Sequence, residues 1–579
     1  MPDPIGIRSA AIIAPEVREH RLLITGSDGT RFTTIGYTLD DAIIEGVRFA
    51  SNASIHWWSS DWGAEWQPQV SLARDGVDLV TTSGRSSKGA HPFAIVSDAQ
   101  QTLIIAVAWS GNWRLAARVR PDGTLVVTAG LDHPIRHAVP AGASVEAPRV
   151  LLSSGHDWND ASRNLVMAVR ATTPTTHSIR TEWNHWWPYE DAGIDANTFL
   201  TNAAAAHRAG LDVAVLDAGW FGRPGSHWFE LRGDWQQENE ERFPGGIVAL
   251  ADRTRALGID FGLWMEPEAI GSEALVNRTH QAVIARDAGG ESLGYVCLGS
   301  PEGRMFVLAS VRQALRSTRA SWLKWDFNLD PGAGCARTDH GHTSSDGLFT
   351  HVRGLYDVLD AVRAEFPGTV LENCSSGGLR WDLGIAAHVD TGFATDPDWP
   401  EHALACRWAS SLFFPPERQL GWCDSEWRGS HPHQHVRAAD GIPPHVLDRI
   451  VVVSMLGGLG VSQRLVDWPT ADLERLHTLV TRYDEHIRPH LADAILERLT
   501  GQPLREGSGE RRVAFLLRSA QGPAWLFCCN LTDEPWDAAF HLGDVTRAED
   551  LLANATATCA DGEVCLRLTA QGCAVVEIQ

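Results

Sequence analysis

Trp322-Leu323-Lys324-Trp325-Asp326 is a short, mostly apolar run that ends in a carboxylate, with indoles on both sides of an ammonium group. Three other segments in the middle of the chain, residues 183–187, 216–220 and 262–268, have the same design of apolar residues followed by acid, amide or indole groups. In a (β/α)8 barrel the functional side chains stand at the carboxyl ends of the strands. The four segments therefore predict a barrel whose chemistry is concentrated at one mouth.

The character of the sequence changes twice along the chain. The first 170 residues or so hold short alternating runs separated by turn pairs such as Asp122-Gly123, a pattern typical of a β-sandwich. Strands then alternate with helices, as where the alanine-rich residues 196–209 precede the apolar residues 213–217, and residues 450–456 are expected to form the last barrel strand. After residue 500 the β-like runs return. We predict three domains: a β-sandwich at residues 1–175, a (β/α)8 barrel at residues 176–492 and an antiparallel β-sandwich at residues 493–579.

Composition narrows the class of protein. Hydrophobic residues make up 44% of the 579 residues and charged residues 21%, as in packed globular proteins. The formal net charge of -23 argues against a nucleic acid partner, because phosphates attract basic surfaces. No apolar run reaches the roughly 18 residues of a membrane span, so no membrane association is expected. The first residues show no secretory signal, and a cytoplasmic protein is expected.

Neither the cysteines nor the histidines predict a metal site. The ten cysteines form no spacing framework and are expected to be buried, reduced thiols. The segment His431-Pro432-His433-Gln434-His435 has no companion acids at zinc spacing, and its proline breaks any helical pair. Tryptophan outnumbers tyrosine 24 to 5, which suits stacking on the C–H faces of sugars, although core packing explains many of these indoles equally well.

Two carboxylates are the leading candidates for catalysis. Retaining hydrolysis of a glycosidic bond uses a pair about 5–5.5 Å apart, one as nucleophile and one as acid/base. Asp326 is the candidate nucleophile, because Lys324 on the same strand face favours its ionised form. Asp396 closes another apolar run, and Pro397 keeps it out of helical geometry, so it is the candidate acid/base. An ordinary acidic loop is the alternative there, and Asp398 competes for the role.

Further polar groups follow the other predicted strands. Glu266 and Glu268 share one strand face and form another paired-carboxylate candidate, with a capped helix start as the alternative. Asp217 and Asp234 supply acceptors for sugar hydroxyls. The run Cys374-Ser375-Ser376-Gly377-Gly378 brings backbone close to a ligand at a strand mouth, unless it is a plain turn.

Together these segments resemble glycoside hydrolase family 36, the α-galactosidase family of clan D, over nearly the whole chain. The similar motifs occur in the family's order at residues 109–113, 183–186, 216–222, 233–235, 262–268, 324–326, 373–378 and 380–382. Asp396 lies 19 residues before Pro415-Pro416, where the family's acid/base motif stands relative to its own proline pair.

The resemblance implies a supersandwich, a (β/α)8 barrel and a C-terminal sandwich. It also implies a retaining exo-α-glycosidase without a cofactor, acting on an oligosaccharide or glycoside, with Asp326 as nucleophile and Asp396 as acid/base. The residues expected to bind the sugar, by stacking or hydrogen bonding, are Trp186, Asp217, Trp220, Asp234, Trp235, Trp264, Glu266, Lys324, Cys374, Ser376, Gly377 and Arg380.

The chain departs from the family pattern at three places. Ala218 stands where the family's second strand usually ends in another aspartate that bonds sugar hydroxyls. Residues 291–299 lack the usual arginine, and the acid/base segment reads Thr-Asp-Pro instead of Ser-Asp-Asn. Both candidate catalytic carboxylates are retained, so an altered sugar specificity is expected: the sugar lacks or modifies O6 or differs at C4, unless His227 or Trp228 replaces the missing carboxylate.

Several alternatives stay open at this point. A transglycosylase would use the same covalent intermediate with a sugar acceptor in place of water. A non-catalytic sugar-binding protein and a metal-dependent barrel hydrolase are the more remote interpretations. A homo-oligomer is possible, in which Trp57, Trp58, Trp62 and Trp66 reach a neighbouring subunit's site, with packing inside the N-terminal sandwich as the alternative.

Overall fold

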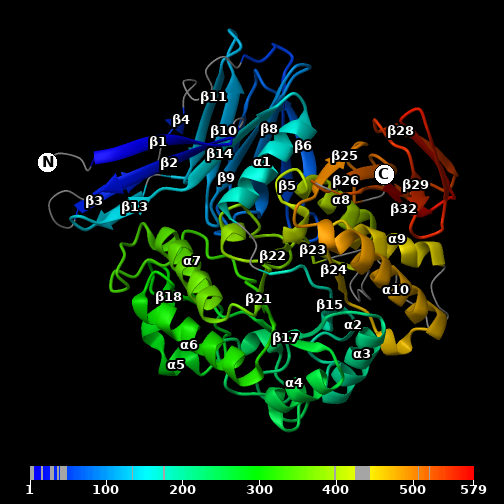
Figure 1. Ribbon diagram of the computed structural model, residues 1–579. Coiled ribbons are helices and arrows are strands. Elements are labelled where there is room, and N and C mark those ends of the chain that lie inside the picture. The colour runs from blue at the N-terminus through cyan, green and yellow to red at the C-terminus, as the bar shows by residue number, and fades with distance from the viewer. Residues whose placement is uncertain are drawn as a thin grey trace.

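The computed structural model describes residues 5–14, 17–25, 31–35, 38–39, 48–133, 135–173, 177–396, 400–423, 444–505, 508–520 and 522–579. Figure 1 shows N-terminal sheets resting against a central barrel, with C-terminal sheets at its side. The predicted architecture of β-sandwich, (β/α)8 barrel and antiparallel β-sandwich is confirmed. The domain boundaries after residues 175 and 492 stay predictions.

The N-terminal part is a stack of antiparallel sheets. The largest has the order β1(Ile5–Ala14), β2(Val17–Thr25), β14(Arg149–Gly155), β9(Thr102–Ala108), β8(Gly89–Ser97), β5(Ser54–Ser60), β6(Gln67–Leu72), with β13(Ser144–Glu146) beside β2. A second sheet has the order β4(Thr38–Leu39), β11(Leu125–Gly130), β10(Arg114–Val119), β7(Val77–Val80), and β12(Ile135–Val139) pairs with β3(Arg31–Ile35).

Strand β9 explains how the sandwich is attached to the barrel. Every residue of β9 is buried. Successive side chains of a strand point to opposite faces. Ile105 and Val107 therefore pack in the core of the sandwich, whereas Ile104 and Ala106 pack in the core that continues into the barrel. Helix α1(Trp158–Thr172), which begins at the N-cap Asp157, covers this second face.

The barrel closes from eight parallel strands. These are β15(Glu182–Asn184), β16(Val213–Leu216), β17(Asp260–Met265), β20(Trp322–Trp325), β21(Val370–Asn373), β22(Thr391–Phe393), β23(Gln419–Cys423) and β24(Gly458–Val461). A hairpin of β18(Ile284–Arg286) and β19(Ser292–Val296) follows the third strand. The helices of this part are α2(Trp186–Tyr189), α3(Ala196–Arg208), α4(Gly246–Ala256), α5(Val276–Thr279), α6(Pro301–Thr318), α7(Gly347–Glu365), α8(Pro400–Ser410), α9(Pro444–Met455) and α10(Thr470–Arg482).

One expected strand of the barrel was wrong. Residues 450–456 lie almost entirely in helix α9, and the last barrel strand is β24. Helix α9 is buried without interruption from Leu447 to Met455. A segment that is apolar on all sides gives no periodic signal, so the sequence does not distinguish a buried helix from a buried strand there.

The C-terminal part consists of two further antiparallel sheets. One has the order β25(Ile495–Arg498), β26(Arg512–Arg518), β27(Ala524–Asn530), β32(Cys573–Ile578), β29(Ala548–Asp550), and the other β28(Trp536–His541), β31(Glu563–Leu568), β30(Thr556–Ala560). Alternate side chains such as Leu516, Leu526 and Leu566 fill the space between the sheets. All ten cysteines carry free thiols, and eight of them are buried.

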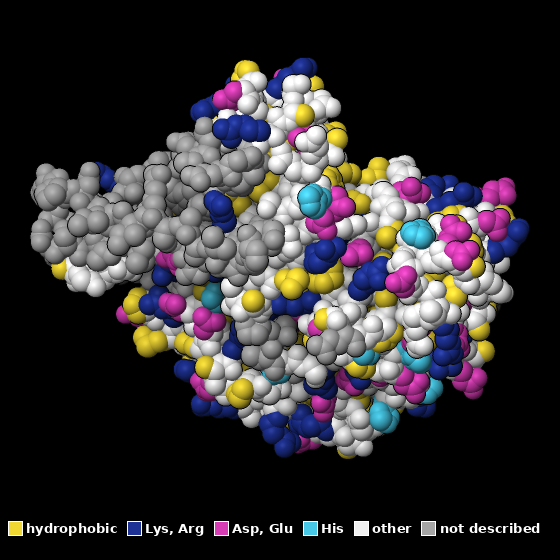
Figure 2. Space-filling view, turned by 45° about the horizontal axis from the view of Figure 1, so that its top comes forward, with side chains coloured by type: hydrophobic (Ala, Val, Ile, Leu, Met, Phe, Trp, Pro, Cys, Tyr) yellow, Lys and Arg dark blue, Asp and Glu magenta, His cyan; other side chains and the backbone are white. Residues whose placement is uncertain are grey.

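The surface carries charges of both signs. In the described part of the face shown in Figure 2, acidic and basic side chains are intermixed. On this face the acidic side chains do not form one separate patch. Within the part of the chain that the structure describes, every helix is too short or too polar to span a bilayer.

Candidate active site

A cavity of about 380 Å³ opens at the carboxyl ends of the barrel strands. Its walls are formed by Trp62, Trp186, Trp187, Glu190, Asp191, Asp217, Ala218, His227, Trp228, Trp264, Lys324, Asp326, Asn328, Ser376 and Asp396. Both candidate catalytic aspartates and the predicted residues Trp186, Asp217, Trp264, Lys324 and Ser376 thus meet in one place. The cavity combines indole faces with carboxylates, as recognition of a sugar requires.

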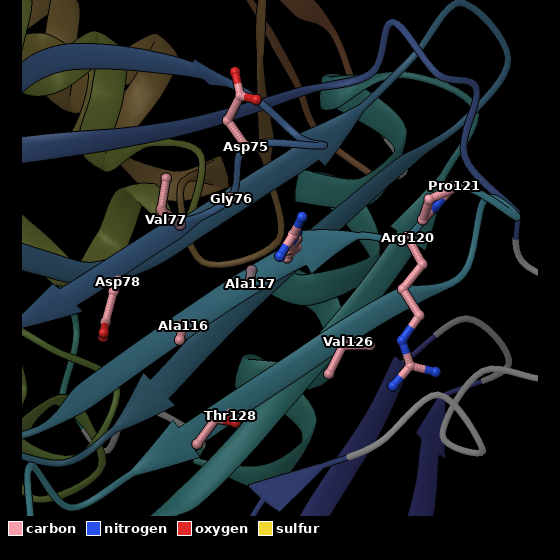
Figure 3. Close-up of a pocket in the computed structure, with 11 residues that line it drawn as sticks. Asp75, Gly76, Val77, Asp78, Ala116, Ala117, Arg120, Pro121, Val126 and Thr128 are labelled. Atoms are coloured by element: carbon pink, nitrogen blue, oxygen red, sulfur yellow. The ribbon is translucent and has the colours of Figure 1, made fainter.

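A wider hollow lies elsewhere, on the sheet that contains β7, β10 and β11, and Figure 3 shows its lining. Its charged lining residues Asp75, Asp78, Arg118 and Arg120 are exposed. Its charged groups face water, whereas the barrel mouth holds buried carboxylates such as Asp217 and Asp326, so we place the candidate site in the barrel.

Asp326 directly follows β20 and is held rigidly. Its Oδ2 accepts hydrogen bonds from the indole of Trp264 at 3.1 Å and from the amide of Asn328 at 2.8 Å. Its Oδ1 accepts from the backbone N–H of Phe327 at 2.8 Å and of Ser376 at 3.3 Å. Only 7% of the side chain is exposed. Four donors therefore fix the orientation of this carboxylate.

Asp396, beyond the end of β22, is held differently. Its Oδ2 accepts a hydrogen bond from the indole of Trp62 at 2.9 Å, and its backbone carbonyl accepts from Trp187 at 2.9 Å. Burial of the carboxyl and the nearby negative charge of Asp326 together raise the pKa of Asp396 to about 7. A carboxyl with such a pKa both donates and accepts a proton near neutral pH.

Lys324, on β20, and Asp217, directly after β16, form a buried ion pair in the cavity wall. Lys324 Nζ lies 3.0 Å from Asp217 Oδ2, and Asn184 donates to the same oxygen at 2.9 Å. The ammonium also lies over the ring of Trp422, 4.2 Å from its centroid. Although burial opposes it, the charge of Asp217 helps to raise the pKa of Lys324 well above its usual value. The ammonium therefore stays charged.

The glycine-rich loop after β21 lies against the segment that carries Asp396. A Cβ at Gly377, where φ is +72°, would lie 2.4 Å from the backbone nitrogen of Asp396, and one at Gly378 would lie 2.2 Å from the carbonyl of Ala394. Only glycine fits so close an approach. Ser376, with φ of 45°, donates its hydroxyl to Asn328 Oδ1 at 2.7 Å. The loop thereby connects the two candidate catalytic segments.

Other predicted sugar-binding residues do not line the cavity. The indole of Trp220 donates to the carbonyl of Trp264 at 3.0 Å, and Trp235 packs against Phe221. Asp234 accepts from the backbone of Leu275 at 2.7 Å. The residues predicted to bind the sugar but placed outside the lining are Trp220, Asp234, Trp235, Glu266, Cys374, Gly377 and Arg380. These hydrogen bonds and ring contacts are made to protein groups, and they support the cavity wall from behind.

The two glutamates after β17 are also committed to protein partners. Glu266 accepts two hydrogen bonds from Arg232, at 2.9 and 2.8 Å, and one from the backbone of Asn328 at 2.7 Å. Glu268 accepts from Arg380 at 2.9 Å and faces His351 Nε2 at 3.0 Å. Both glutamates are fully buried, so they position the neighbouring strands.

The Glu268–Arg380 pair makes a stability prediction. Burial disfavours the charged form of Glu268, but the charge of Arg380 overcomes it and, with His351, lowers the pKa of Glu268 to about 2. The Arg380→Met variant leaves this carboxylate without its main counter-charge and should lose about 3–5 kcal/mol of unfolding free energy, measured by urea denaturation.

The double variant Arg380→Met, Glu268→Gln should regain part of that loss, and equal stability of the two variants would contradict the pairing. Because the folded pKa of Glu268 is depressed, its contribution is present above the unfolded pKa of about 4.3 and is lost as the pH falls toward 2.

Several lining residues were not predicted as site residues. Trp62, one of the four indoles considered as able to reach a neighbouring subunit's site, follows β5 and donates its indole N–H to Asp396 of its own chain. Of the other three indoles of that group, Trp58 and Trp66 are buried in the core, and Trp57 is partly buried against the core of the sandwich. Glu190 and Asp191 follow the short α2, and a Cβ at Gly219 would lie 2.9 Å from the Cα of Asp191. Asp191 thus lies beside the position where Ala218 replaces the family's aspartate.

Two expectations from the sequence fall outside the described residues. They concern Asp398, the alternative to Asp396 as acid/base, and the histidine-rich segment 431–435. Asp396 itself is among the described residues.

Comparisons with known proteins show which family and fold this chain shares. The model of the Melibiase family matches residues 175–492. The chain is 26% identical over 372 residues to an alpha-galactosidase of Escherichia coli, covering 62% of this chain and 51% of the relative. It is 23% identical over 421 residues to alpha-galactosidase AgaA of Geobacillus stearothermophilus, covering 69% of this chain and 55% of the relative. The chain spans about half the length of the curated relatives it matches.

Among solved structures, the GH36 alpha-galactosidase AgaA from Geobacillus stearothermophilus superposes with a TM-score of 0.79 at 17% identity, covering 97% of this chain and 80% of that one. An AgaA variant solved in complex with raffinose gives a TM-score of 0.79 at 18% identity, covering 96% and 79%. At this identity the likeness shows a shared fold.

Proposed function

Because the chain belongs to the Melibiase family, as the sequence resemblance to glycoside hydrolase family 36 predicted, we propose that it is a retaining exo-α-glycoside hydrolase of the α-galactosidase type. The observation that carries this proposal is the pair of unlike aspartates in one cavity. Asp326 is fixed by four donors, whereas the pKa of Asp396 is raised to about 7. A nucleophile and an acid/base catalyst need these two different environments.

In the proposed first step, Asp326 attacks the anomeric carbon and the glycosidic C–O bond breaks. The proton of Asp396 passes to the leaving oxygen, so the aglycone departs as a neutral alcohol. The carboxylate of Asp326 becomes an ester and loses its charge. Since that charge contributes to the raised pKa of Asp396, the pKa then falls. Asp396 is thus prepared to take a proton from the water that cleaves the ester.

The remaining lining residues fit recognition of a single sugar ring. The indoles of Trp186 and Trp264 offer faces for stacking, and Lys324 with Asp217 offers a donor and an acceptor for hydroxyls. Relatives named alpha-galactosidases, and AgaA variants solved with raffinose and stachyose, support a glycoside substrate. We further propose that Asp191, beside Ala218, supplies the acceptor that the second strand lacks.

The direct test is hydrolysis of aryl α-glycosides of galactose, glucose, N-acetylgalactosamine, fucose and arabinopyranose, with the Asp326→Asn variant as the blank. Proton NMR of the first-formed sugar reports the configuration. Release of the α-anomer is expected, and first release of the β-anomer would overturn the retaining mechanism. A preference for galactoside means that the family's usual substrate is kept, whereas a preference for another sugar means that Ala218 has changed the pocket.

Asp191→Asn tests the proposed hydroxyl acceptor. A neutral amide accepts a weaker hydrogen bond than a carboxylate, so kcat/KM for the best substrate should fall about 10–100-fold. Deoxy analogues should identify the hydroxyl, because the substrate that lacks it should be insensitive to the variant. Asp234→Asn is the matched control: Asp234 accepts from the backbone of Leu275 and is outside the lining. An equal effect of both variants would contradict the role of Asp191.

A further inference from the structure

A second cluster of reactive side chains lies away from the sugar cavity. It consists of Cys297, Cys335, His340 and His342, all buried. One ligand atom from each residue lies within 4.8 Å of all the others. Cys297 directly follows strand β19, whereas the other three residues belong to the long segment between β20 and α7. The four donors thus come together from two separate connections between barrel strands, the one that follows β17 and the one that follows β20.

The spacing of the donor atoms matches a tetrahedral ion. With Zn–S bonds of about 2.3 Å and Zn–N bonds of about 2.0–2.1 Å, the edges of a tetrahedron are roughly 3.3–3.8 Å long. Cys297 Sγ lies 3.3 Å from His342 Nε2, and Cys335 Sγ lies 3.7 Å from His340 Nδ1. These two sulfur–nitrogen edges are therefore already close to the lengths that a bound ion would impose.

The surroundings of His342 orient its ring for a ligand role. Its Nδ1 lies 2.8 Å from the carbonyl of Thr343, which is a hydrogen-bond acceptor, so Nδ1 carries the proton and the lone pair of Nε2 faces the sulfur of Cys297. Metal-bound histidines usually donate their other N–H in this way. A Cβ at Gly299 would lie 2.8 Å from the ring of His342, so a glycine is needed for the ring to lie there.

We propose that Cys297, Cys335, His340 and His342 form a structural Zn²⁺ site. Two sulfur and two imidazole ligands in tetrahedral arrangement select zinc over magnesium or calcium, which prefer oxygen ligands. Four protein ligands complete the coordination, so no position is left for water or substrate. The ion therefore has no part in bond cleavage and acts as a cross-link.

The cross-link would restrain the segment 326–346, which begins at the candidate nucleophile Asp326. Residues 326–346 contain neither helix nor strand, and connections longer than about 15 residues without such structure are uncommon unless they are functional. Asp326 and Asn328 stand at the start of this segment. Its other fastenings include a hydrogen bond of 2.7 Å from Ala336 to Arg286, at the β18–β19 hairpin. Zinc would join the segment 326–346 to the end of the β18–β19 hairpin and would thereby restrain the residues that follow Asp326.

The test is the zinc content of the full chain, purified without a histidine tag or chelator and measured by mass spectrometry of the element. About one tightly bound zinc ion per chain is expected. Cobalt substitution should give the intense visible absorption of a tetrahedral site with thiolate ligands. In the Cys335→Ser and His342→Ala variants the zinc content should fall at least about tenfold, whereas Cys528→Ser, which removes a buried thiol of β27, should keep it.

Measurements on the wild type keep the proposal testable if these variants fail to fold. Removal of zinc with a strong chelator should lower the melting temperature by several degrees, and added Zn²⁺, but not Mg²⁺, should restore it. Hydrogen exchange should increase in residues 327–346. A reduced wild-type chain that takes up no zinc, or a Cys297–Cys335 disulfide in the peptide map of the freshly isolated protein, would overturn the proposal.

Discussion

Asp326→Asn should abolish turnover of every α-glycoside that the wild type hydrolyses, with kcat lower by on the order of 10⁴-fold or more. An amide of the same shape keeps the place of the carboxylate in the wall, but it neither attacks the anomeric carbon nor forms the ester. The fold should be preserved, because Asp326 accepts its hydrogen bonds at the mouth of the barrel and an amide of the same shape fills the same space. Unfolding curves and initial rates measure the two effects.

A variant with a smaller side chain at position 326 tests whether Asp326 acts as the nucleophile, and not only whether activity requires it. In Asp326→Gly the space left by the side chain admits azide, which should attack the anomeric carbon from the same side and expel an aryl leaving group directly. The product should be the β-glycosyl azide from an α-glycoside. Near-normal turnover by Asp326→Asn, or failure of azide to give any glycosyl azide with a folded glycine variant, would refute the nucleophile assignment.

Asp326→Asn should also change the neighbouring acid. The pKa of Asp396 is raised by burial and then by the charge of Asp326. Removing that charge should therefore lower the pKa of Asp396 below about 7, as the covalent intermediate would. This expected shift connects the two residues through electrostatics and does not depend on any bound sugar.

The barrel and its candidate site were largely predictable because the chemistry follows the strands. Asp217, Lys324 and Asp326 lie at the ends of apolar strands, and all three line the cavity. To predict each of these three residues, it was enough to recognise the apolar strand before it and to know that the carboxyl ends of the barrel strands meet at one mouth. The glycines after β21 were expected to bring backbone close to a ligand, and the structure places them against the segment of a catalytic candidate, since a Cβ at Gly377 would meet the backbone of Asp396.

The remainder depended on contacts between segments far apart in the sequence. Trp62 reaches Asp396 across 334 positions, and no local pattern indicates which loop of a sandwich will face a barrel. Trp220 and Trp235 share the composition of sugar-stacking indoles, yet they pack in the core. Trp220 lies between Gly219 and Phe221 and Trp235 lies beside Asp234, so the local sequence did not distinguish a sugar-stacking indole from one in the core. The Cys297–His342 cluster has no recognisable spacing, because the fold brings its members together from two separate segments.

Asp396→Ala should affect substrates according to their leaving groups. For an oligosaccharide, whose departing alcohol needs a proton, kcat/KM should fall by about 10²–10⁴-fold. For a dinitrophenyl glycoside, whose leaving group departs as a stable anion, the first step should be nearly unaffected and the glycosyl-enzyme should accumulate. A burst of dinitrophenol followed by slow release is the signature, measured by rapid mixing. An equal loss of kcat/KM on both substrates would refute the acid role.

The pH profile and the azide product give the same variant two further tests. Because the raised pKa of Asp396 is about 7, the wild-type kcat/KM for an oligosaccharide should be at its plateau below that pH and fall about tenfold per unit above it, as the acid loses its proton. This basic limb should be absent from Asp396→Ala.

Azide should accelerate release of the intermediate that accumulates in Asp396→Ala and give the α-glycosyl azide, since it attacks the face opposite Asp326. The opposite configurations expected from Asp326→Gly and Asp396→Ala assign the two aspartates to opposite faces of the sugar ring, and the same configuration from both variants would contradict the double-displacement mechanism.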